Sequence, residues 1–244
     1  YNGIKMCRAG ARPVGQDTGL AQVRDLAQTL LNDAATEGAT DAATDAAGRL
    51  GAVTHRDVLA DYAAFLRSLV DLSGNRRLRV VVDAGNGMGG HTVPAVLETG
   101  AGLAELPLEV IPLYFELDGT FPNHEANPLD THTLADAQQA VRAGQYDFAA
   151  CFDGDADRVG FIDEKGDIIP MDMITALIAR TLLKKNPGAN IFYDLRSSWA
   201  VREVIEEAGG IPNRSRVGHA FIKAQMREKD ALFAGELSGH YYFK

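Results

Sequence analysis

The sequence predicts an α/β protein made of tandem α/β domains, with mixed sheets lying between helices. Three observations lead to this prediction. From residue 55 onward, short β-branched runs alternate with apolar patterns of helical period. The chain has 244 residues, which is enough for one large or two ordinary domains. Its hydrophobic fraction of 46% is enough to form a buried core.

The N-terminal part predicts one helix followed by a linker. Residues 17–33 carry apolar side chains at helical spacing, and Asp17 or Thr18 is suited to cap the first turn. The apolar stripe consists of Leu20, Val23, Ala27, Leu30 and Leu31. Residues 34–53 are mainly Ala, Thr, Gly and Asp and lack large apolar side chains. We therefore expect a linker there.

The rest of the chain alternates helices and strands. A second helix is predicted at about residues 55–72, with Thr54 as its cap. Further helices are predicted at 134–143, 171–185, 198–208 and 219–229. Strands are predicted at 78–85, 108–114, 146–152, 159–163, 190–195 and 231–236. A break around Gly166 and Pro170 divides the pattern into two units, and ligands of such sheets bind at strand ends.

The composition argues against several classes of protein. A formal net charge of −9 argues against a nucleic-acid partner, although a local group of Arg and Lys still allows an anionic small substrate. No apolar run has membrane-spanning length and no signal peptide is present, so we expect no membrane partner. Cys7 and Cys151 are the only cysteines, which indicates a reduced, cytoplasmic protein. Because the first residue is Tyr1 rather than Met, we expect the natural start to lie upstream.

The segment CFDGDADRVGF, residues 151–161, concentrates acidic side chains beside the core. Asp153, Asp155 and Asp157 stand at alternate positions between two predicted strands, and in an extended segment such residues point to one side. Bare carboxylates this close repel one another, and a divalent cation removes the repulsion. All-oxygen ligands favour Mg²⁺ or Mn²⁺ over Zn²⁺, and Arg158 adds a donor suited to phosphate. The segment therefore predicts a Mg²⁺ site that handles phosphate.

Two other interpretations of this segment are open. One is an exposed acidic turn, because Asp-Gly pairs are common in hairpins. The other is an EF-hand loop, with the three aspartates at positions 1, 3 and 5 and Glu164 at position 12. That interpretation fits poorly, because Arg158 stands where the loop needs glycine and because the flanking segments predict strands.

Residues 85–90, with the sequence GNGMGG, follow a predicted strand and match the pattern G-x-G-x-x-G. This pattern formally allows a dinucleotide site. The acidic residue expected about 20 positions later is only approximately matched by Glu105 and Glu109. A tight turn from strand to helix is the interpretation that we prefer.

Taken together, the motifs resemble the α-D-phosphohexomutase family, and most of all its phosphomannomutase/phosphoglucomutase branch. FDGDADRVG resembles the metal loop of that family, and GELSGHYYFK (235–244) resembles its sugar-recognition loop. YNGIK (1–5) is similar to the stretch after its phosphoserine loop. VVVDAGNGMGG (80–90) and DGTFPNHEANPL (118–129) are similar to segments of its second domain. The matching segments span the chain in family order.

The resemblance implies a plan of four domains, of which this chain holds a part. Residues 1–53 correspond to the C-terminal part of domain 1 plus a linker, and residues 54–166 to domain 2 with the metal loop. Residues 167–244 correspond to an incomplete domain 3 with the sugar-recognition loop. The phosphoserine is then expected a few residues before Tyr1, and a phosphate-clamping fourth domain after Lys244. We expect a chain without these parts not to turn over on its own.

The resemblance also implies a reaction. Phosphate moves reversibly between O1 and O6 of a hexose phosphate, of mannose and/or glucose, through a phosphoserine and a bisphosphate sugar. Asp153, Asp155 and Asp157 would hold Mg²⁺ against the phosphoserine, and Arg158 would grip the phosphoryl group. Lys5 would stabilise the transferred group or assist proton transfer.

The remaining implied site residues concern the sugar. Glu236 and Ser238 would bind sugar hydroxyls, and His240 would line the same loop. Arg196 falls where the family carries a basic residue, often Lys, and is assigned to substrate binding. His219 falls on a family active-site position, although an ordinary structural role is equally open.

Two alternative functions are kept. One is a noncatalytic fragment that binds Mg²⁺ and a phosphosugar. The other is a phosphoglucosamine mutase, in which different residues are usual where Ala156 and Leu237 stand here. The sequence predicts no oligomeric state and does not rank mannose against glucose.

Overall fold

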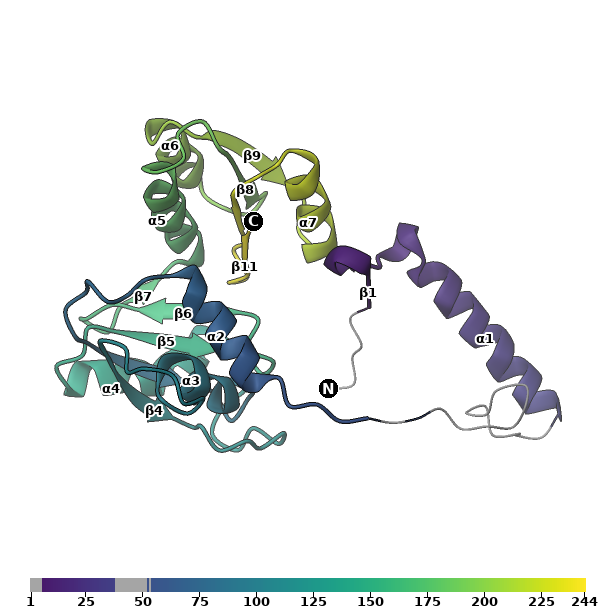
Figure 1. Ribbon diagram of the computed structural model, residues 1–244, viewed down its shortest axis with the longest axis horizontal. Coiled ribbons are helices and arrows are strands. Elements are labelled where there is room, and N and C mark those ends of the chain that lie inside the picture. The colour runs from purple at the N-terminus through teal and green to yellow at the C-terminus, as the bar shows by residue number, and fades with distance from the viewer. Residues whose placement is uncertain (1–5, 38–51, 53) are drawn as a thin grey trace. The chain divides into compact units, whose positions relative to one another are not determined.

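The computed structural model describes residues 6–37, 52 and 54–244. The chain divides into two compact units, one formed by residues 1–56 with 218–220 and the other by residues 57–217 with 221–244 (Figure 1). Among the described residues, no helix combines the length and the apolar character that a membrane crossing requires.

The first unit contains the predicted N-terminal helix, α1 (Leu20–Glu37). The proposed capping residues belong instead to a 3-10 turn before the helix, where the Thr18 hydroxyl accepts a hydrogen bond from the Gly15 N–H at 2.8 Å. The predicted apolar stripe is not buried, since exposed fractions rise from 48% for Val23 to 67% for Leu31. The helix therefore exists where its period predicted it, but Val23, Leu30 and Leu31 of the stripe are exposed.

The start of the first unit is a small hairpin, in which β1 (Cys7–Arg8) pairs antiparallel with β2 (Arg12–Pro13). At the other end of α1, the helix continues into the predicted linker as far as Glu37. Residues 38–51 and 53 of that linker lie outside the described residues.

The second unit begins with a mixed sheet in the order β4-β3-β5-β6-β7. Its strands are β3 (Leu78–Asp83), β4 (Leu108–Leu113), β5 (Phe148–Phe152), β6 (Val159–Ile162) and β7 (Ile168–Ile169). β3 pairs parallel with β4 and β5, whereas β6 and β7 are added antiparallel. The acidic segment is the connection between β5 and β6.

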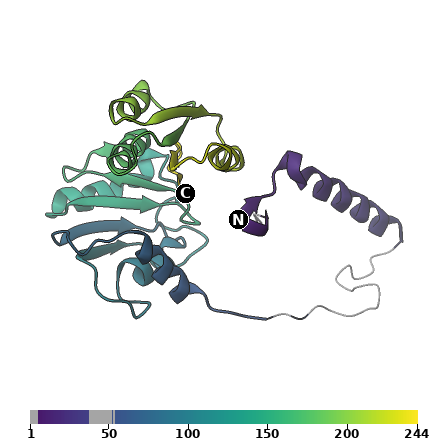
Figure 2. The same cartoon turned by 45° about the horizontal axis from the view of Figure 1, so that its top comes forward.

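Helices cover both faces of this sheet (Figure 2). They are α2 (Leu59–Leu69), α3 (Gly89–Leu97) and α4 (Ala135–Ala143). Val80 and Val82 pack with Val93 of α3, whereas Val81 faces the other way and packs with Val141 of α4. The continuous apolar run of β3 is thus explained, because the strand is buried on both faces.

The helix predicted at 55–72 is shorter than expected. α2 begins after Val58, and the Leu59 N–H donates to the side chain of Asp57 at 2.9 Å. The prediction that Thr54 caps the helix is therefore wrong, because Val58 stands at the cap position and Asp57, one residue before it, accepts from the first turn.

A second mixed sheet follows in the order β11-β10-β8-β9. Its strands are β8 (Asn190–Asp194), β9 (Ile211–Ser215), β10 (Phe233–Gly235) and β11 (Tyr241–Phe243). The helices are α5 (Met171–Leu183), α6 (Trp199–Glu207) and α7 (His219–Glu228). Ile191 packs with Ala179 of α5 and Ile205 of α6, whereas Phe192 packs with Ile222 of α7 on the opposite face. The predicted α/β class with mixed sheets between helices is confirmed.

The two sheets repeat one local arrangement. In each sheet, the first strand along the chain, β3 or β8, pairs parallel with a later strand, β5 or β10. A short loop then joins that later strand to an antiparallel neighbour. In the first sheet this loop joins β5 to β6, and in the second it joins β10 to β11. These loops carry the acidic segment and the GELSGH segment, so the two motifs occupy equivalent positions in the two sheets.

Candidate functional site

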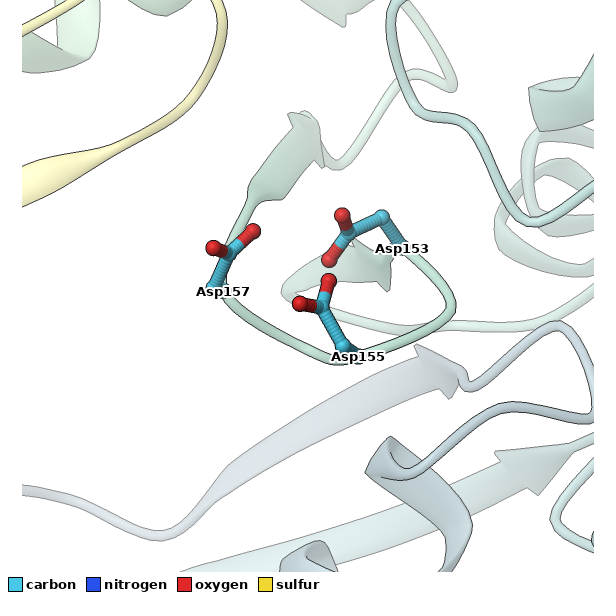
Figure 3. A group of neighbouring side chains, drawn as sticks. All are labelled: Asp153, Asp155 and Asp157. Atoms are coloured by element: carbon cyan, nitrogen blue, oxygen red, sulfur yellow. The ribbon is translucent and has the colours of Figure 1, made fainter. Parts of the chain in front are cut away.

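The metal loop, residues 153–158, brings three carboxylates together (Figure 3). One oxygen from each of Asp153, Asp155 and Asp157 lies within 4.8 Å of the others. The loop is not extended, however, as the alternation argument assumed. Ala156 has a φ of 59°, in the left-handed region, and its N–H donates to the Asp153 carbonyl at 3.1 Å. The carboxylates therefore converge because the chain curls, and the all-oxygen donor set fits Mg²⁺.

Asp153 and Arg158 close the base of the metal loop. Asp153 is 1% exposed, and its Oδ1 accepts from the Arg158 backbone N–H at 3.0 Å while Oδ2 accepts from Nε at 2.7 Å. Burial raises the pKa of Asp153, and the hydrogen bonds from Arg158 oppose that rise. Arg158 also donates from Nη1 to the side chain of Asn127 at 3.5 Å. The guanidinium is thus held in a fixed place beside the carboxylates.

The GNGMGG turn packs against the backbone of the metal loop. It joins β3 to α3, as the turn interpretation predicted. The Met88 N–H donates to the Gly154 carbonyl at 3.0 Å, and a Cβ on Gly87 would lie 2.7 Å from the same oxygen. The metal loop therefore packs directly against the turn, and Gly87 allows the close approach of these two backbones rather than of a dinucleotide.

The EF-hand interpretation is wrong. The metal loop is flanked by the strands β5 and β6 rather than by helices. Glu164 stands in the turn after β6, beyond the end of that strand, and so is not a neighbour of the three aspartates along the loop.

The sugar loop, residues 236–240, turns the chain from β10 into β11. The Glu236 N–H donates to the His240 carbonyl at 2.9 Å. The Ser238 hydroxyl lies 2.8 Å from His240 Nδ1. Glu236 is only 2% exposed, and its Oε2 accepts from the Tyr242 hydroxyl at 2.6 Å. The three predicted sugar ligands therefore share one loop, with the carboxylate at its base.

The metal loop and the sugar loop touch. His240 Nε2 lies 3.3 Å from Asp157 Oδ1, and the Val159 N–H donates to the Gly239 carbonyl at 3.2 Å. Gly239 adopts a φ of 86°, and a Cβ there would lie 3.0 Å from the Val159 carbonyl oxygen. Two segments that are distant in sequence, one acidic and one holding the predicted sugar ligands, thus lie against each other.

Asp194 is a residue of this site that sequence reasoning missed. It ends β8, is 0% exposed and accepts from the Leu237 N–H of the sugar loop at 2.9 Å. It also accepts from Arg196 Nη2 at 2.6 Å, which raises the pKa of that guanidinium. Asp194 therefore fixes both the predicted substrate-binding Arg196 and the start of the sugar loop. The signal was available, since VVVD, CFD and FYD each end an apolar run with aspartate.

Asp83, at the end of β3, is a second buried carboxylate that was missed. Its Oδ2 lies 3.0 Å from His124 Nε2, and His124 Nδ1 lies 2.9 Å from the Glu125 carbonyl. Burial raises the pKa of Asp83, and the neighbouring His124 opposes this. The pair holds the segment that also contains Asn127, the partner of Arg158.

The two remaining predicted residues are not brought into this group by the described contacts. His219 is exposed and is the first residue of α7. Lys5 lies outside the described residues.

Comparison with known families decides what this site belongs to. The family model described as "Phosphoglucomutase/phosphomannomutase, alpha/beta/alpha domain II" matches residues 60–166, and the corresponding model of domain III matches residues 170–244. The chain belongs to the α-D-phosphohexomutase family. The predicted divisions at 54–166 and 167–244 stay predictions.

Individual phosphohexomutases agree with this assignment. The phosphomannomutase of Vibrio cholerae is 36% identical over 245 residues and that of Escherichia coli 39% identical over 244 residues. Each alignment covers 100% of this chain but only 50% and 51% of the relative. A solved phosphoglucomutase/phosphomannomutase family protein from Burkholderia thailandensis matches with a TM-score of 0.75 and 32% identity, over 92% of this chain and 45% of that one. The chain thus spans about half the length of the curated relatives it matches.

Proposed function

We propose that this chain forms the metal- and sugar-binding part of a phosphohexomutase, which interconverts hexose 1-phosphate and hexose 6-phosphate of mannose and/or glucose. The observation that carries the proposal is the contact between the metal loop and the sugar loop, made by His240 and Asp157 at 3.3 Å. The phosphomannomutases that match the whole chain support the same reaction class. In this proposal the phosphoserine belongs to the part of the relatives' length that the chain does not span.

The metal loop would serve the phosphoryl group. Asp153, Asp155 and Asp157 would hold Mg²⁺. When bound, the cation supplies positive charge that offsets the negative charge of a transferring phosphoryl group. Arg158 binds phosphoryl oxygens in this proposal, and its bond to the buried Asp153 keeps the guanidinium in place without a large loss of side-chain entropy.

The sugar loop would serve the hexose. Glu236, a carboxylate, accepts hydrogen bonds from sugar hydroxyls, and Ser238 and His240 add a hydroxyl and an imidazole beside it. Arg196 offers positive charge to the phosphate that is not being transferred. For His219 and Lys5 we keep the roles that the family resemblance implies, at the active site and beside the transferred group.

The metal role is tested by a pair of neutralising variants in the β5–β7 region. In calorimetric titration with Mg²⁺, Asp155→Asn removes one of three charged ligands and is expected to weaken binding at least about tenfold. Glu164→Gln removes the same charge from the exposed turn after β6 and is expected to leave the Mg²⁺ affinity unchanged. Equal affinity in the wild type and Asp155→Asn would remove the metal site from the proposal.

The reaction itself is tested in a chain restored to the relatives' full length. Phosphorus NMR distinguishes mannose 1-phosphate from mannose 6-phosphate and follows their interconversion directly. We expect Mg²⁺-dependent turnover that Asp155→Asn abolishes and Glu164→Gln retains. Binding of Mg²⁺ and hexose phosphate without any turnover of the restored protein would refute the mutase assignment.

A further inference from the structure

Tyr242 is the hydrogen-bond partner of the buried carboxylate in the sugar loop. Its hydroxyl donates to Glu236 Oε2 at 2.6 Å. The two residues are six positions apart, and the antiparallel pairing of β10 with β11 brings them together, since Tyr242 pairs with Ala234. The Tyr242 ring stacks at 13° to the His240 ring with a centroid distance of 6.2 Å. One tyrosine thus contacts two of the predicted sugar ligands.

The chemistry of this contact favours a fixed carboxylate. A buried carboxylate is costly unless donors satisfy it, and a hydrogen bond to a charged acceptor is among the stronger ones. Burial, followed by the neighbouring Glu236, raises the pKa of Tyr242, so the phenol keeps its proton and remains a donor at any physiological pH. A carboxylate offers about four lone-pair sites, and the bond from Tyr242 uses one of them.

We propose that Tyr242 is a positioning residue, which sets the orientation of the Glu236 carboxylate so that it can accept hydrogen bonds from hexose hydroxyls. This inference rests on the proposed function, because it takes Glu236 to be a sugar ligand. Without the phenol hydroxyl, the carboxylate loses one donor at Oε2 and is held less firmly in its present orientation, and sugar binding then has to supply the ordering that Tyr242 supplies now.

The neighbouring residue provides a matched control. Tyr241 lies on the same strand, and its hydroxyl donates to the Met171 carbonyl at 3.2 Å. Its burial likewise raises its pKa, and its bond is to α5 rather than to the sugar loop. Tyr241→Phe therefore removes a buried hydroxyl and one hydrogen bond without touching Glu236. Tyr242→Phe removes the same group together with its hydrogen bond to Glu236.

The experiment titrates the 244-residue chain by two-dimensional NMR, which follows weak binding, with three separate probes: Mg²⁺, inorganic phosphate and mannose 6-phosphate. Tyr242→Phe is expected to weaken mannose 6-phosphate binding about tenfold, which corresponds to about 1.4 kcal/mol. The affinities for Mg²⁺ and inorganic phosphate are expected to stay at the wild-type values. Tyr241→Phe is expected to leave all three affinities unchanged.

Each outcome has a definite meaning. If the wild type does not bind mannose 6-phosphate, the proposed function fails and this inference falls with it. If the wild type binds and Tyr242→Phe behaves like Tyr241→Phe, only this inference is overturned. An equal loss for all three probes would show a merely structural role and would also overturn it.

A thermodynamic cycle gives a second test of whether Tyr242 acts through Glu236. Glu236→Gln removes the acceptor charge, and adding Tyr242→Phe to it is expected to cost no further mannose 6-phosphate affinity, since the hydroxyl acts through that carboxylate. Independent, additive losses from the two changes would overturn the inference.

Discussion

A methyl group at Gly87 should separate two backbones that now touch. Gly87 is buried in the turn before α3, and its φ is not in the left-handed region, so Gly87→Ala introduces no backbone strain of its own. The added Cβ would lie 2.7 Å from the Gly154 carbonyl oxygen and 2.9 Å from Gly154 Cα. Both atoms are main-chain atoms of the metal loop, so no flexible side chain can move out of the way.

The size of the effect follows from these distances. Ordinary contact for a Cβ begins at 3.4 Å, so the two segments must part by about 0.7 Å, the difference between 3.4 and 2.7 Å. The same movement would lengthen the Met88-to-Gly154 hydrogen bond from 3.0 Å to about 3.7 Å, beyond hydrogen-bond range. Overpacking and the lost bond together should lower the free energy of unfolding by about 2–3 kcal/mol. Because Mg²⁺ demands near-ideal ligand geometry, its affinity should fall about tenfold or more.

The assay measures both quantities on each variant, by urea unfolding and by Mg²⁺ titration. Gly119→Ala is the control, because Gly119 has no atom within 4 Å of its added Cβ and its φ is also outside the left-handed region. We expect that control to match the wild type. If Gly87→Ala kept both the stability and the Mg²⁺ affinity of Gly119→Ala, the turn would not support the metal loop and the reasoning would be wrong.

Two further predictions concern titration and burial. The Asp147 carboxylate accepts from the Arg76 side chain and the Arg79 N–H, which hold its pKa below the usual 3.8. Its contribution to stability is therefore complete above pH 3.8 and lost as the pH falls through the lower folded-state value, so Asp147→Asn should cost about 1 kcal/mol at pH 7 and nothing at low pH. Urea unfolding across pH checks this, and a cost that persisted in acid would contradict it. Burial raises the pKa of Cys151, so iodoacetamide should label exposed Cys7 in the native chain and Cys151 only in urea; peptide mass spectrometry showing equal native labelling would disprove that burial.

The parts of the fold that sequence patterns predicted are those whose local composition agrees with their burial. Val80–Val82 form a β-branched run because β3 is covered on both faces, and the run alone was sufficient. The missed strands β1, β2, β7, β9 and β11 are all at sheet edges, where one side has no pairing partner among the described residues. An edge tolerates Pro212 and the polar residues beside it, so β9 carries no strand pattern. A helix was expected after the GNGMGG turn, but the apolar pattern gave no range for α3, because it begins with Gly89 and contains Pro94.

The candidate site likewise contains some features that the sequence predicted and others that it did not. Three aspartates in one short loop predicted that their carboxylates converge. The cause of the convergence was not predicted, because Ala156 takes a left-handed conformation that sequence alternation does not reveal. Tyr242 reaches the predicted residue Glu236 because β10 pairs with β11. Asp194 reaches the sugar loop through the distant Leu237 N–H, although its bond to Arg196 is local. Apolar periodicity carries no information about which buried acid meets which donor.

The contact of His240 with Asp157 has a thermodynamic consequence. In the proposed function, a cation that binds Asp157 changes the hydrogen bonding that His240 offers a hexose, and a hexose that binds His240 changes the ligation that Asp157 offers a cation. Reciprocity then requires that the factor by which either occupant alters the other's dissociation constant be the same in both directions. A dissociation constant for the cation is consequently defined only at a stated concentration of the hexose, and the reverse also holds.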